Sequence, residues 1–198
     1  MRYPRLGSFL LLLAGVSGAA AQNSGTCAAP IVFSSKSGTE LTIESRSGEI
    51  DLVGSDKDGI RVDCNLEDLD HAQDVRIQFE QTGDFARLLV RGGSVHNLKI
   101  HIEVPRRTNF KLRVPAGQVK VDQVSGDKDI ALAAGQIVVS NVTGAEYRSV
   151  DASVGVGEVR AQSFGIEKGG FFRKFSRESP GGHYRLRAHL ISGSVELN

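Results

Sequence analysis

Apolar and polar residues alternate along most of this chain, and glycines interrupt the alternation at regular distances. Glycines stand at positions 117, 126, 135 and 144. Residues 117–125 are nearly repeated as residues 135–143, so the strongest self-match has a period of 18 residues. A short fixed period is typical of one supersecondary unit stacked on copies of itself. The pattern therefore predicts an all-β fold, a single-domain β-solenoid with about 18 residues per repeat.

A six-residue phrase recurs inside and outside this block. It consists of a small or apolar residue, Gly, a polar residue, a branched apolar residue, any residue and an apolar residue, and it occurs at 47–52, 116–121, 134–139, 156–161 and 192–197. One such unit cannot bury its apolar side alone, so neighbouring repeats must cover one another. We expect glycines 126 and 135 to turn the backbone at positive φ. The side chains expected to stack in inward rows are Val119, Val121, Leu132, Ile137 and Val139.

The remaining segments also alternate with the period of strands. No helix of normal length is predicted, and the 23 glycines are expected in turns. After Gly144 the spacing of the phrase widens to 22 residues (from Gly135 to Gly157), which predicts an inserted loop near 151–156. The small and polar residues at 22–36 predict a flexible leader. The domain is expected to span residues 37–198.

The first residues predict export. A basic start (MRYPR) precedes an apolar run at residues 6–16 and the small residues Ala19, Ala20 and Ala21. This arrangement is that of a secretory signal peptide, here residues 1–21. No later apolar run approaches the ~20 residues that cross a bilayer, so no transmembrane segment is expected in the mature chain. We expect the periplasm, the cell surface or the external medium.

The two cysteines, Cys27 and Cys64, are expected to pair, because disulfides persist in exported proteins. Closing the loop between them would stabilise the fold by about 4 kcal/mol. The alternative is two free buried thiols.

The formal net charge of +1 falls by two when Arg2 and Arg5 are removed. This near-neutral balance gives no electrostatic case for nucleic acid.

The order of several segments resembles a known family. Residues 100–105 (IHIEVP) and 110–114 (FKLRV) precede the tandem glycine phrases, and residues 184–197 close the chain. This order resembles the bacterial putative-adhesin domain family, a domain of unknown function, from Ser37 to the C-terminus. The resemblance implies a one-domain β-solenoid exported to the cell envelope, and it carries over no catalytic residues. The name adhesin is itself an analogy.

The motifs that suggest catalysis or metal binding are incomplete. Residues 56–59 (DKDG) start like a calcium loop, but Arg61 stands where such a loop needs Gly, so they predict a structural turn. No two histidines have metal-ligand spacing. Gly155 and Gly157 lack the third glycine of a dinucleotide fingerprint. We therefore predict no cofactor, metal site or catalytic residue, although distant strands could still bring two carboxylates together.

Residues 168–182 depart in composition from the rest of the chain. Glycine pairs bound a segment rich in aromatic and cationic residues, and it is the candidate interaction loop. One interpretation is that its phenylalanines cap the open end of the solenoid. The other is that the loop contacts anionic glycans or lipid headgroups. The candidate residues are Lys168, Phe171, Phe172, Arg173, Lys174, Phe175 and Arg177.

The function that we expect is non-catalytic: an exported, adhesin-like β-solenoid that presents a surface to an unknown envelope, glycan or protein partner. Two alternatives stay open. One is a carbohydrate-active β-solenoid enzyme. A mixed cluster of acidic and basic side chains on an exposed sheet would favour this enzyme, whereas a face rich in Ser, Thr and Asn would favour adhesion. The other is a periplasmic structural module of an envelope-stress or assembly system.

Overall fold

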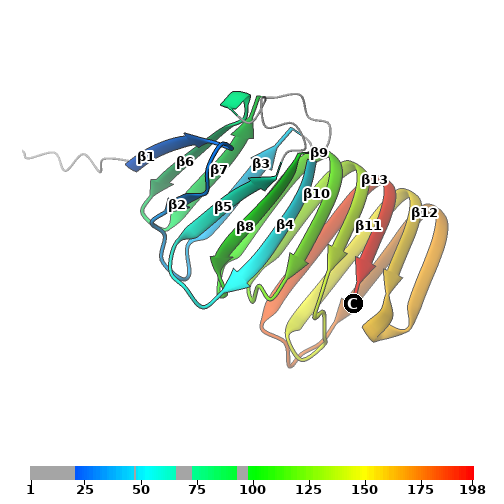
Figure 1. The fold of residues 1–198 in the computed structure, drawn as a ribbon. Coiled ribbons are helices and arrows are strands. Elements are labelled where there is room, and N and C mark those ends of the chain that lie inside the picture. Colours follow the sequence, from blue (N-terminus) through cyan, green and yellow to red (C-terminus); the bar gives the residue numbers. More distant parts are fainter. Residues whose placement is uncertain (1–20, 47, 66–72, 93–97) are drawn as a thin grey trace, which may run out of the picture.

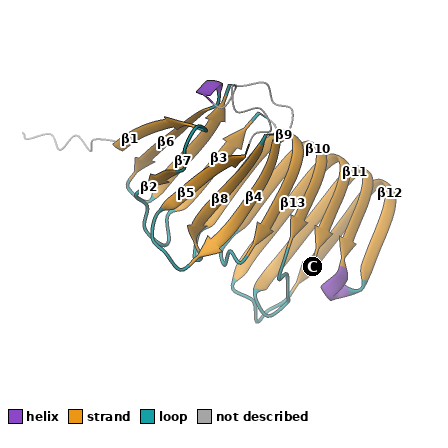
Figure 2. Cartoon of the chain, viewed as in Figure 1, coloured by secondary structure: helices purple, strands orange, loops and turns teal. Residues whose placement is uncertain are grey.

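The computed structural model describes residues 21–46, 48–65, 73–92 and 98–198. The predicted signal peptide, except Ala21, lies outside the described residues. The described residues form a 13-stranded sheet that is not closed. Strands make up almost all of the regular structure, with a 3-10 turn η2 at Gln162–Phe164 (Figure 2). Within these ranges, no helix has both the length and the apolar character needed to cross a membrane.

The strand bounds follow the alternating segments of the sequence. They are β1 (Ala21–Thr26), β2 (Ile31–Phe33), β3 (Glu40–Ser45), β4 (Gly48–Ser55), β5 (Ile60–Asn65), β6 (Arg76–Thr82), β7 (Phe85–Arg91), β8 (Lys99–Pro105), β9 (Asn109–Asp122), β10 (Lys128–Val139), β11 (Tyr147–Ala161), β12 (Ile166–Glu178) and β13 (Tyr184–Leu197).

The long parallel strands each bend once, at a glycine, and we call this bend the corner. The first half of β9 pairs with β3, and its second half pairs with β4. β3 and β4 in turn pair with β7 and β8. All these pairs are parallel, as are those of β10, β13 and β11 further along (Figure 1). Antiparallel strands end the stack: β5 and β6 on one side and β12 on the other.

The two halves of the bent sheet enclose one apolar core. Each half buries every second residue, as its alternating pattern requires. The buried side chains of both halves form a single cluster. Burying one Val, Leu or Ile contributes about 1.5–3 kcal/mol. The predicted inward rows are confirmed, because Val119, Val121, Leu132, Ile137 and Val139 are all buried.

The period of 18 residues is the pairing register of neighbouring strands. Gly117 pairs with Gly135, and Val121 pairs with Val139. The glycines of the five phrases stack in one row, which we call the glycine row, with φ between 119° and 144°. Their spatial order differs from their sequence order, since Gly193 lies between Gly135 and Gly157. The row is Gly48, Gly117, Gly135, Gly193 and Gly157.

The prediction of an inserted loop at 151–156 is wrong. Residues 151–156 lie inside β11, where Ala152 and Val154 continue the buried alternation. The extra residues instead lie earlier, in the connection 140–146 and in a register shift between Tyr147 and Ser149. Glycine spacing alone could not distinguish these places, because an insertion anywhere between two phrases lengthens their separation equally.

The leader predicted at 22–36 contains two strands. β1 pairs with β6 along its whole length, and β2 pairs with β5. The flexibility expected from composition is therefore corrected: small and polar side chains do not prevent backbone pairing with an otherwise open sheet edge.

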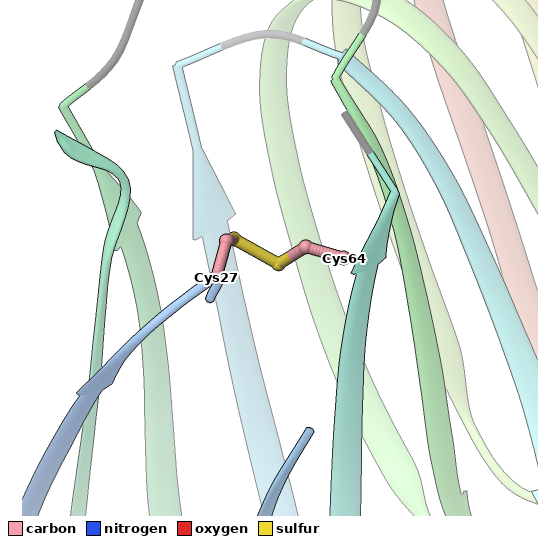
Figure 3. Close-up of a disulfide and its surroundings, with 2 residues drawn as sticks. All are labelled: Cys27 and Cys64. Atoms are coloured by element: carbon pink, nitrogen blue, oxygen red, sulfur yellow. A yellow bond between two sulfur atoms is a disulfide. The ribbon is translucent and has the colours of Figure 1, made fainter. Parts of the chain in front are cut away.

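The predicted disulfide is confirmed. Cys27 lies directly after β1, Cys64 lies in β5, and their Cα atoms are 5.2 Å apart (Figure 3). The Cys27 N–H also donates to the Val75 carbonyl at 3.1 Å. The bond therefore joins the first strand of the described chain to the other half of the bent sheet.

Candidate functional site

The predicted interaction loop is in fact an edge strand. Residues 166–178 form β12, which pairs antiparallel with β11, and no other described strand pairs with it. It lies at the opposite end of the stack from β1 and β6 (Figure 1). The glycine pairs suggested a loop, but β11 supplies a free edge whose backbone groups determine the pairing.

The three phenylalanines of β12 have different roles. Phe175 is buried and packs against Phe164 of η2, with ring centroids 5.3 Å apart. It covers the end of the core, as the capping interpretation predicted for all three. Phe171 and Phe172 instead have 69% and 88% of their surface exposed. Phe172 also has φ of 50°, a left-handed conformation that is uncommon for a bulky residue.

None of the four cations of β12 forms a salt bridge among the described residues, although the charge of Lys174 helps to lower the pKa of the Asp151 carboxyl group. Lys168 donates to the Lys174 carbonyl at 3.4 Å, and Arg173 donates to the Gly169 carbonyl at 2.7 Å. The Arg177 guanidinium lies 5.6 Å from the Phe164 ring. The side chains of Lys168 and Arg173 thus cover backbone carbonyls of the edge strand and discourage further strand pairing. Their positive charge is not neutralised by an ion pair.

Exposed apolar residues continue from β12 along the corner. Val156 of β11 pairs with Phe171, and Ile191 of β13 lies one residue before the partner of Val156, Ser192. Phe171, Phe172, Val156 and Ile191 are four of the six large apolar side chains exposed among the described residues. Exposed small residues extend the line over β10 and β9. We call this set the corner ridge: Pro115, Ala116, Ala133, Ala134, Ile191, Val156, Phe171 and Phe172.

The glycine row explains why the ridge is exposed. A Cβ at Gly135 would lie 1.7 Å from the Gly117 carbonyl oxygen, so the backbones touch at the corner. In a straight strand, one of two successive residues faces the core. At the bend the alternation is interrupted, and Ala133 and Ala134 are both exposed. The ridge residues therefore face outward because the corner leaves no interior position for them.

A hollow of about 560 Å³ adjoins the ridge, and the ridge residues Pro115, Ala133 and Ile191 line part of it. Ala131 and Ala133 line it between the larger Arg113 and His189. His189 Nδ1 lies 2.7 Å from the Ser153 hydroxyl. The hollow is therefore mainly apolar where the alanines lie, with a cation and an imidazole at its rim.

The outer faces of the sheet carry mixed charges in rows. One row runs across β7, β3, β9, β10, β13 and β11 as Arg87, Thr42, Lys111, Asp129, Arg187 and Asp151. Hydrogen bonds lower the pKa of carboxyl groups on these faces: one from Lys120 acts on Glu49, and one from Ser176 acts on Asp151. These carboxylates stay ionised, whereas a general acid needs a raised pKa.

Lys128 occupies a core position that the sequence did not identify. It stacks between Phe110 and Leu186 and is only 2% exposed. Its ammonium donates to the carbonyls of Val124 and Gly126 at 2.6 and 3.2 Å and to the Tyr147 hydroxyl. Burial lowers the pKa of Lys128 to about 8. Its three donors have three acceptors, so it fastens the β9–β10 turn to the start of β11.

Comparison with known proteins supports the fold. No protein-family model matches the chain, and no curated protein matches it. The crystal structure of a putative cell adhesion protein from Clostridium sporogenes is similar, with a TM-score of 0.56 and 12% identity. The match covers 90% of this chain and 99% of that one. At this identity the likeness shows a shared fold, and the particular family suggested by the sequence has no family-model match.

Proposed function

We propose that this chain is an exported, non-catalytic, adhesin-like β-solenoid that binds an envelope partner through its corner ridge and β12. The observation that carries the proposal is the gathering of four exposed large apolar side chains beside four cations that form no salt bridge among the described residues. Contiguous exposed apolar surface commonly marks an interaction site. Uncompensated positive charge beside it favours an anionic partner.

Export and the solenoid description have separate support. The Cys27–Cys64 bond is compatible with an oxidising compartment outside the cytosol. The predicted signal peptide at residues 1–21 agrees with this location. The parallel register of 18 residues between β9 and β10 supports a solenoid of stacked coils, with antiparallel strands closing its ends. The fold shared with the putative cell adhesion protein is consistent with adhesion.

The mixed charged rows are the observation that favours the enzyme alternative. Many of their carboxylates bind cations, as in the pairs Arg113–Asp129 and Lys120–Glu49, whose closest N–O distances are 2.9 and 2.8 Å. The lowered pKa values of Glu49 and Asp151 are the opposite of what protonation of a glycosidic oxygen requires. These pairs support a structural role for the charged rows, and we therefore favour binding without turnover.

Binding to isolated envelopes tests the proposal. The purified mature chain, Phe171→Ser/Phe172→Ser and Val32→Ser/Phe85→Ser would each be titrated against an envelope fraction that contains membranes and polysaccharide. The last variant is the control, since Val32 and Phe85 are 65% and 64% exposed away from the ridge. We expect the ridge variant to bind about tenfold more weakly at an unchanged Tm, and the control to bind like the parent.

Three results would overturn the proposal. Full envelope binding by the ridge variant would remove the ridge from the interaction. Release of reducing ends from any member of a polysaccharide panel, measured with the same preparations, would establish the carbohydrate-active enzyme in its place. Absence of any envelope binding by the parent would favour the periplasmic structural module.

A further inference from the structure

We propose that the partner of the corner ridge is the surface of an anionic lipid bilayer, with Phe171 and Phe172 inserted among the lipid headgroups. This inference rests on the proposed function, because it names the partner of the same surface. Three features carry it: the shape of the ridge, the chemistry of its outermost side chains, and the charge beside them.

The shape of the ridge fits a broad, soft surface. The ridge follows the outer corner where the two halves of the sheet meet, so it projects from the molecule. It crosses β9, β10, β13, β11 and β12, and strands about 4.8 Å apart make it roughly 19 Å long. Small-molecule and sugar sites are usually concave. The hollow takes in only the part of the ridge on β9, β10 and β13, and the projecting Val156, Phe171 and Phe172 instead fit a surface that can deform around them.

The outermost side chains of the ridge are apolar. Phe171, Phe172, Val156 and Ile191 offer no side-chain hydrogen-bond donor or acceptor with which to recognise a sugar hydroxyl. Phe172 adopts positive φ, and both it and its neighbour Phe171 are exposed. Phe is one of the residues that membrane-surface segments bury at the boundary of headgroups and acyl chains, beside Lys and Arg.

The cations lie where lipid phosphates would be. Lys168, Arg173 and Lys174 flank the two phenylalanines in sequence, and Arg173 pairs across strands with Val154, two residues before the ridge residue Val156. Elsewhere on the sheet, cations such as Arg113 and Lys120 bind carboxylates. Basic residues beside an apolar insertion are attracted to anionic lipids, and this attraction weakens with salt. A purely apolar partner would offer no counter-charge to these residues.

The chain permits a direct measurement of insertion because it contains no tryptophan. Phe172→Trp places a single tryptophan on the ridge, and Phe85→Trp places one at a matched exposed position away from it. Each would be mixed with vesicles of phosphatidylcholine alone or of phosphatidylcholine with phosphatidylglycerol. We expect a blue shift, and quenching by brominated lipid, for Phe172→Trp on the anionic vesicles and neither change for Phe85→Trp.

Cosedimentation with the same vesicles separates the apolar and electrostatic contributions. We expect Phe171→Ser/Phe172→Ser to reduce anionic vesicle binding about tenfold, and Lys168→Gln/Lys174→Gln to remove most of the preference for anionic over neutral vesicles. Val32→Ser/Phe85→Ser should bind like the parent. Equal Tm values would exclude unfolding as the cause.

The outcomes distinguish this inference from the proposed function. If the parent binds no vesicle, or if both tryptophan variants respond alike, the bilayer inference is overturned. Should envelope binding still depend on the ridge in that case, the proposed function stands, with a polysaccharide or protein as the partner. If the ridge variant keeps full envelope binding, the proposed function itself fails.

Discussion

Replacing Gly135 by Ala tests the glycine row on which the bend of the sheet depends. Gly135 lies in the middle of this row, between Gly117 and Gly193. An added Cβ would lie 1.7 Å from the Gly117 carbonyl oxygen, although real Cβ atoms essentially never approach closer than 3.0 Å. The neighbouring strands would have to separate by more than about 1 Å, which backbone hydrogen bonds of about 2.9 Å cannot absorb.

The expected cost of Gly135→Ala has two parts. The φ of 130° is one that L-residues rarely adopt, and holding such a conformation costs about 1–3 kcal/mol. Each buried backbone group that loses its partner adds about 1–3 kcal/mol. We therefore expect a loss of about 3–5 kcal/mol in the free energy of unfolding, a large fraction of the 5–15 kcal/mol of an ordinary domain.

Urea unfolding followed by far-UV circular dichroism measures this loss. Gly181→Ala is the matched control, because its Cβ would meet nothing within 4 Å and its φ is not in the positive range. The control should stay within about 0.5 kcal/mol of the parent. If Gly135→Ala unfolds within about 1 kcal/mol of the parent at an unchanged m-value, the close stacking of the row is refuted.

Three further perturbations test the core, its buried cation and the disulfide. Val139→Asp places an unpaired charge in the buried row and should destabilise by several kcal/mol in the same assay; a parent-like midpoint would show that the side chain does not point inward. Burial lowers the pKa of Lys128 from 10.5 to about 8 in the folded protein. Between these two pH values the unfolded state binds more protons than the folded state, so the free energy of unfolding should rise with pH in this range. From pH 8 to 10 this rise is about 2–3 kcal/mol, and Lys128→Met should remove it; equal pH slopes for both proteins would contradict the assignment. Cys27→Ala/Cys64→Ala should lower stability by about 4 kcal/mol and make it insensitive to reductant, whereas a parent whose Tm is unaffected by reductant would contradict the bond.

Local patterns determined much of the fold. Alternation with a period of two predicts which side chains face inward, because successive side chains of a strand point to opposite faces. The five glycine phrases predicted turning points, and the glycines of all five lie in the row at positive φ. The pairing of Cys27 with Cys64 followed from there being two cysteines in a chain expected to be exported.

The identity of β12 was harder to predict from its sequence. Phe175 is the only buried residue of this strand, so the usual alternation of buried and exposed residues is missing. Lys128 shows the opposite difficulty, because a lysine in a repeat is expected to face solvent. Its burial depends on acceptors from Val124, Gly126 and Tyr147, which only the folded chain brings together.

The sequence by itself determined most of the strands, the inward rows and the corners of this protein, since each depends on residues close together in the chain. Only the tertiary structure decided that β1, β2 and β12 are strands, the order of the strands in the sheet, and hence the corner ridge. β13 inserts between β10 and β11, so Ile191 and Val156 lie on adjacent strands and lead to Phe171. Each repeat presents similar backbone groups and similar apolar side chains to its neighbours. The recurring phrases therefore do not indicate which repeat lies next to which in the sheet.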